Sequence, residues 1–73
     1  MNNSAGPRTW YAFTITDDLA TDIRVFPSVN ERDMALVDDI LQSPRMPITV
    51  HHGSVLAVTK KDAENAIRFG KWE

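Results

Sequence analysis

The stretch TWYAFTIT, residues 9–16, is the clearest strand signal in this chain of 73 residues. It is rich in aromatic and β-branched residues, and side chains along a strand alternate between two faces. The alternation divides the stretch into two sets, Tyr11, Phe13 and Ile15 on one face and Trp10, Ala12 and Thr14 on the other. We therefore expect a sheet in which this strand presents a different set of side chains to each side.

A second alternating run follows closely. Asp17-Asp18 interrupts the first run, TDIRVF (21–26) resumes the alternation, and Pro27 ends it. A hairpin through residues 17–20 is the shortest connection between the two strands. Residues 1–8 show no apolar period, so we expect a flexible arm over 1–8 and a single α+β domain over 9–73.

A first helix is predicted over about residues 29–42. Ser28 and Glu31 have the S-x-x-E spacing of a capping box, which marks a helix start. Apolar residues then recur at helical spacing, with aspartates on the other side. The apolar set, which we expect to face the core, is Met34, Val37, Ile40 and Leu41. Ser43-Pro44 should end the helix, because a residue before proline avoids the helical conformation.

A last helix is predicted behind Thr59, a favoured N-cap residue, and Gly70 is its expected C-terminal stop. Its apolar stripe is Ala63, Ala66 and Ile67. This helix is short, so we expect it to dock on the sheet.

The segment PITVHHGSVLAVTKK, residues 47–61, holds both histidines of the chain. Two short alternating runs flank His52-Gly53, which predicts a hairpin with its turn at 52–53 or 53–54, where Gly53 supplies a positive φ at little cost. Either register puts one apolar set on a shared core face, namely Ile48, Val50, Val55 and Ala57. The predicted order is ββαββα, with an antiparallel or mixed sheet and both helices on one of its faces.

The residue types offer little to catalysis. Adjacent histidines in a strand point to opposite faces, so His51 and His52 cannot easily bind one metal, and the chain has no cysteine. The aspartate pair at 17–18 is better explained as part of a turn, and the aspartate pair at 38–39 as the solvated side of a helix. Phosphate-binding glycine loops and nucleophile motifs are absent. We expect a binding module without enzymatic activity, cofactor or metal.

Charge divides the chain into an acidic and a basic part. Residues 1–41 hold three basic and seven acidic residues, and residues 42–73 hold five basic and three acidic ones. Candidate RNA contacts in the second part are Lys60, Lys61, Arg68 and Lys71. With a pI of about 5.5 this basic patch is thin, which favours an auxiliary contact within a larger assembly over independent binding. Candidate partner-binding residues are Trp10, Arg24, Arg45 and Trp72, with Trp10 expected to be the more exposed tryptophan.

No leader pattern opens the sequence, and no apolar run reaches the about 18 residues of a membrane span. These features predict a soluble, cytoplasmic, unprocessed protein.

The full length of the chain, above all TWYAFTITDD (9–18) and SPRMPITVHHGSVLAVTKKDAENAIRFGKWE (43–73), resembles the small early proteins with which lytic phages of plant-pathogenic bacteria bind the host RNA polymerase. The resemblance implies a monomeric, non-enzymatic regulator in the host cytoplasm. It implies binding to the N-terminal region of the β′ subunit, near ω and the RNA exit channel, with inhibition of host promoters through σ displacement and suppression of intrinsic termination. The resemblance carries no motif that assigns a role to a single residue.

Three other interpretations compete with this one. The acidic part of the chain could mimic a DNA backbone and inhibit a nuclease or another defence factor. A small nucleic-acid-binding regulator would bind RNA or DNA alone, with a steep dependence on salt. A minimal enzyme that depends on His51 or His52 is the remaining alternative.

Overall fold

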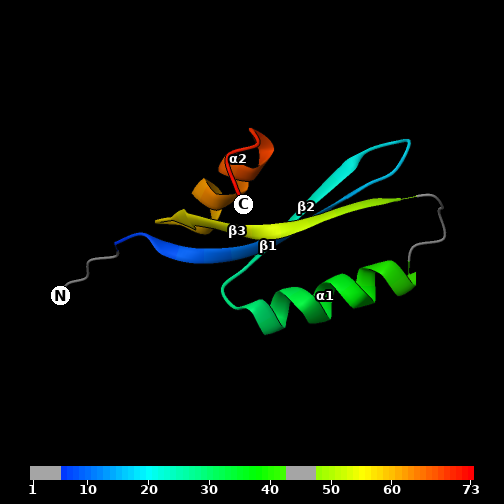
Figure 1. Cartoon of the computed structure of the whole chain (residues 1–73), viewed down its shortest axis with the longest axis horizontal. Coiled ribbons are helices and arrows are strands. Elements are labelled where there is room, and N and C mark those ends of the chain that lie inside the picture. Colours follow the sequence, from blue (N-terminus) through cyan, green and yellow to red (C-terminus); the bar gives the residue numbers. More distant parts are fainter. Residues whose placement is uncertain (1–5, 43–47) are drawn as a thin grey trace.

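The computed structural model describes residues 6–42 and 48–73. In this part of the chain the elements are β1 (Arg8–Thr16), β2 (Thr21–Phe26), α1 (Val29–Gln42), β3 (Thr49–Ala57) and α2 (Lys60–Arg68). The strands form an antiparallel sheet in the order β2-β1-β3 (Figure 1). The predicted α+β class, with an antiparallel sheet and two helices, is confirmed.

Strand β1 lies at the centre of the sheet and is buried from both sides. Ala12 and Phe13 are adjacent and point to opposite faces, yet neither is accessible to solvent. The predicted hairpin to β2 is confirmed: Asp17 Oδ1 accepts hydrogen bonds from the N–H groups of Leu19 at 2.8 Å and Ala20 at 2.9 Å. Arg8, which we assigned to the flexible arm, already belongs to β1, and residues 1–5 lie outside the described residues.

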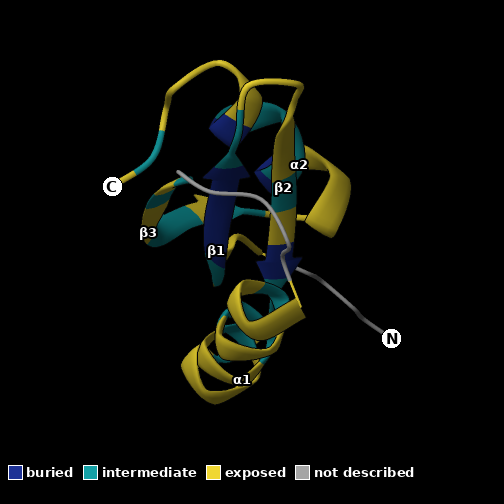
Figure 2. Ribbon diagram, turned by 90° about the vertical axis from the view of Figure 1, so that its right-hand side faces the viewer, coloured by how far each residue is buried: buried dark blue, intermediate teal, exposed yellow. Residues whose placement is uncertain are grey.

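The two helices cover opposite faces of the sheet (Figures 1 and 2). Ala63 and Ile67 of α2 pack against Ala12 and Val25 on one face. Helix α1 contacts β1 and β2 from the other side, where Arg32 lies near Tyr11. The expectation that both helices share one face is therefore wrong. Because β1 carries apolar side chains on both of its faces, each face needs its own cover.

Strand β3 runs without interruption through the histidines. The predicted hairpin at residues 52–53 is wrong, because Gly53 pairs with Ala12 inside one strand. Val50 pairs with Ile15 and Val55 with Trp10, so Val50 and Val55 lie on opposite faces instead of sharing one.

A close approach of the chain end explains the glycine in β3. A Cβ atom at Gly53 would overlap the backbone carbonyl of Glu73 and lie 3.4 Å from Cε3 of Trp72. The Glu73 N–H donates a hydrogen bond to the Ser54 carbonyl at 3.0 Å. The missing side chain thus makes room for the C-terminal tail, defined here as residues 71–73, whose Trp72 packs against the core.

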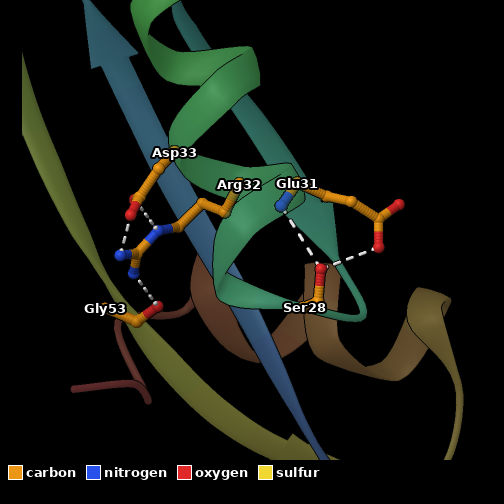
Figure 3. A network of polar contacts seen from close by, with 5 residues as sticks. All are labelled: Ser28, Glu31, Arg32, Asp33 and Gly53. Carbon is orange, nitrogen blue, oxygen red and sulfur yellow. Dashed lines mark hydrogen bonds and ion pairs between the residues drawn. The ribbon is translucent and has the colours of Figure 1, made fainter.

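The predicted start of α1 and both predicted ends of α2 are confirmed, whereas Ser43-Pro44, the expected stop of α1, lies outside the described residues. The Ser28 hydroxyl accepts a hydrogen bond from the Glu31 N–H at 3.2 Å and donates one to the Glu31 carboxylate at 2.8 Å (Figure 3). Thr59 Oγ1 accepts the Asp62 N–H at 3.1 Å. Gly70 has a φ of 75°, and its N–H and the next one donate to carbonyls of the last turn of α2 at 3.0 and 2.8 Å.

Candidate protein-interaction surface

Helix α1 turns its main apolar stripe away from the sheet. Met34 is 74% exposed, Val37 57% and Leu41 78%, and Ile40 is exposed as well. The expectation that this stripe faces the core is wrong. The sheet side of α1 instead carries half-buried residues at helical spacing, namely Arg32, Ala35, Leu36 and Asp39.

The first turn of α1 is attached through Arg32, whose side chain is 11% exposed. Its Nη1 donates to the Gly53 carbonyl at 3.3 Å, and its guanidinium lies 6.0 Å from the centre of the Tyr11 ring. The same guanidinium binds Asp33 Oδ1 through Nε at 3.0 Å and Nη2 at 2.8 Å (Figure 3). Arg32 thus joins the helix to β3 and β1, and Asp33 holds the guanidinium in position.

A second attachment lies two turns further along the helix. Asp39 Oδ2 forms an ion pair with Arg24 Nη1 of β2 at 3.0 Å. The Arg24 guanidinium also lies 5.4 Å from the centre of the Phe26 ring. The two attachments fix which side of α1 meets the sheet, and the apolar stripe is left on the opposite side.

The exposed stripe is bordered by carboxylates. Asp33, Met34, Val37, Asp38 and Leu41 line a shallow hollow along the helix, and we call these five residues the α1 outer face. Both Asp38 carboxylate oxygens accept a hydrogen bond from the Gln42 amide at 3.1 Å. This donor is neutral, so the negative charge of Asp38 is not compensated by it. An exposed apolar strip with an acidic border is typical of a protein-binding surface.

The tryptophan predicted to be exposed has a structural role. Trp10 is half-buried against the core under α2, and its Nε1 donates to the Ala57 carbonyl at 3.1 Å. The Arg8 guanidinium lies 5.0 Å from the centre of its ring. The expectation of an exposed Trp10 is wrong, because its strand face is the one that α2 covers. Trp72 is half-buried at the same core.

Of the remaining candidate partner residues, the structure describes Arg24, which lies on the side of the sheet opposite these tryptophans. Arg24 lies on the α1 side of the sheet, bound to Asp39, and Arg45 lies outside the described residues. The candidate RNA contacts are all exposed and lie in α2 or directly after it, so they belong to the side of the sheet opposite α1: Lys60, Lys61, Arg68 and Lys71. These cations thus lie on the side of the sheet opposite the aspartates of α1.

The histidines do not form a site together. His51 and His52 are adjacent in β3, so their side chains point to opposite faces, and both are exposed. Residues 6–42 and 48–73 contain no group of three or more His, Cys, Asp or Glu side chains that could hold a metal ion. An open hollow of about 620 Å³ on the α2 side is lined in part by Thr14, His51, Arg68 and Trp72.

Sequence reasoning overlooked Arg32, the cation that attaches α1 to the sheet. A signal existed: Arg32 is the single basic residue within an otherwise acidic helical segment, residues 29–42. No protein-family model, curated protein or solved structure matches this chain. Neither described helix has the length and apolar character needed to cross a bilayer.

Proposed function

We propose that this chain is a non-enzymatic regulator that acts by binding another protein, and that its target is the RNA polymerase of a bacterial host. The observation that carries the first part is the α1 outer face, where Met34, Val37 and Leu41 are exposed although the helix has a sheet to pack on. The choice of polymerase rests on the resemblance of the sequence to early phage regulators. In this proposal the chain binds near the β′ N-terminal region and the RNA exit channel, in the host cytoplasm.

Binding at that position would act on two stages of transcription. It would inhibit host promoters by displacing σ, and it would suppress intrinsic termination by affecting the emerging RNA. The placement of the helices supports a division of labour. Because α1 and α2 cover opposite faces of the sheet, a protein bound to α1 leaves the cations of α2 accessible to a nucleic acid.

The first test is a pull-down of the tagged chain from bacterial lysate, with bound proteins identified by mass spectrometry after washes at rising salt. We expect the native chain to recover the large polymerase subunits and the Leu41→Ser variant to recover neither of them. The matched control is Leu19→Ser, because Leu19 is 69% exposed in the turn between β1 and β2 and does not belong to the α1 outer face. Recovery of a nuclease without polymerase would contradict the proposal and favour a defence inhibitor.

The second test separates the two faces in transcription reactions with purified polymerase. Joint replacement of Lys60, Lys61 and Arg68 by alanine should reduce readthrough of an intrinsic terminator more than it reduces polymerase binding. Leu41→Ser should reduce both in parallel. If the triple variant lost binding and readthrough equally, the assignment of the basic side to RNA would be wrong.

A further inference from the structure

We propose that the α1 outer face binds a single basic helix of the partner, packed side by side with α1 as in a short coiled coil. The inference deepens the proposed function and needs from it only that the chain binds a protein. It commits to one kind of occupant, an amphipathic helix with an apolar seam flanked by lysine or arginine.

The spacing of the stripe is that of a coiled-coil seam. Met34, Val37 and Leu41 are separated by three and four residues, which matches successive a, d and a positions of a heptad. In this register Asp38 follows Val37 at an e position. The hollow on α1 is lined by these four residues together with Asp33. A hole that accepts one side chain of a facing helix is made of four such residues, so the hollow has the composition of a knob-accepting hole.

The flanking charges identify the partner as basic. In the same register Asp33 precedes Met34 at a g position, so an aspartate borders the seam on each side. Side chains at e and g form the interhelical ion pairs that select a partner in coiled coils. Among the described residues, Asp38 is bound to the neutral amide of Gln42 within α1, and Asp33 shares its charge with Arg32. Lysine or arginine opposite Asp38 gains an ion pair, whereas a glutamate there is repelled.

The same charges argue against a second copy of this chain. In a parallel pair of α1 helices the g residue Asp33 would meet the e residue Asp38 of the other copy. In an antiparallel pair e positions face e positions and g positions face g positions, so the register decides whether the two copies of Asp33 or the two copies of Asp38 meet. Both arrangements bring like charges together next to an apolar seam, where repulsion is least screened.

The size of the surface suits a weak helix contact. Helix α1 has 14 residues, and a helix rises about 1.5 Å per residue, so its length is about 21 Å. The α1 outer face therefore meets about two turns of a partner helix, an interface below the about 1,200 Å² of standard complexes. Its charges should matter for partner choice as much as its apolar area does.

The inference can be tested on the full chain, labelled with ¹⁵N, by NMR titration with two designed peptides. One peptide carries Leu at a and d and Lys at e and g, and the other replaces the Lys with Glu. We expect the basic peptide to shift amide signals of α1 and to bind at least tenfold more tightly than the acidic one. Asp38→Lys, which leaves the Arg32–Asp33 ion pair intact, should remove this preference.

Control variants separate folding from binding. Leu41→Ser should lower the affinity for the basic peptide at least tenfold, and Leu19→Ser should leave this affinity unchanged. Both variants should keep the native pattern of amide signals. Equal affinity for the two peptides, shifts outside α1, or dimerisation of the chain through α1 would each overturn the inference. If the basic peptide binds as expected but polymerase is not captured, the proposed target is wrong and the helix-binding surface stands.

Discussion

Replacing Gly53 by alanine should detach the C-terminal tail, residues 71–73. The new Cβ would overlap the Glu73 carbonyl, so either strand β3 or the tail must move. The strand has little freedom, because Gly53 pairs with Ala12, which is completely buried at the centre of the sheet. Residues 71–73 are attached to β3 by the backbone hydrogen bond from Glu73 to Ser54 and to the core by Trp72, so we expect this segment to move instead.

The expected loss follows from the contacts of the tail. A buried tryptophan removes about 150–250 Å² from water, and half of this at about 25 cal/mol per Å² gives about 2–3 kcal/mol for the half-buried Trp72. The hydrogen bond from Glu73 to Ser54 adds about 1 kcal/mol. Alanine is better than glycine in a strand by about 0.5–1 kcal/mol, which offsets part of the loss. The net cost is about 2–3 kcal/mol, against a total stability of about 3–5 kcal/mol for a domain of this size.

A double-mutant cycle in urea isolates the effect of the tail. In the full chain, Gly53→Ala should lower the free energy of unfolding by about 2–3 kcal/mol, equivalent to a fall in Tm of about 10–20 °C. In a chain that ends at Lys71 the same substitution should be neutral or slightly stabilising, because the residue whose carbonyl it would overlap is gone. An equal loss in both backgrounds would refute the argument and place the strain within the sheet.

Three further substitutions are expected to lower the free energy of unfolding by different amounts. Thr59→Ala removes the N-cap hydrogen bond of α2 and should cost about 1 kcal/mol in urea unfolding. Phe13→Ala empties the fully buried site beside Phe26 and should cost about 3–5 kcal/mol, which would leave the chain largely unfolded by circular dichroism. Arg24→Ala breaks a half-exposed ion pair with Asp39 and should cost below about 1 kcal/mol, with a smaller loss at high salt.

The parts of the fold that were predictable depend on residues close together in sequence. The Asp17 turn bonds donors two and three residues ahead, and the Ser28 and Thr59 caps each bond a residue three positions ahead. Such contacts are formed by any chain with the same few residues in the same order, so residue types identify them. For this reason the β1–β2 hairpin and the starts of both helices agree with the prediction.

The predictions that were wrong concern positions whose structure is determined by a residue distant in the sequence. By local rules, a glycine between two apolar runs, such as Gly53, favours a turn. In the structure Gly53 lies inside a strand, and glycine is required there because a Cβ atom would overlap the carbonyl of Glu73, twenty positions later. Helical periodicity identified the stripe of α1, yet it could not reveal which side of the helix meets the sheet. The side that meets the sheet is set by two contacts with other strands, that of Arg32 with the Gly53 carbonyl and that of Asp39 with Arg24. The spacing of residues within the helix does not reveal these contacts.

The orientation of α1 links the stability of the fold to its proposed use. A surface helix ordinarily buries its widest apolar stripe, and about 14 isolated residues make a marginal helix in water. Here the sheet side relies in part on Arg32 and Asp39, while Met34, Val37 and Leu41 stay exposed. Burying that stripe against the sheet would add apolar contact, so its exposure costs stability in a domain with little to spare. A bound partner helix would recover the lost contact, which is why we locate the interaction on α1 and not on the basic side.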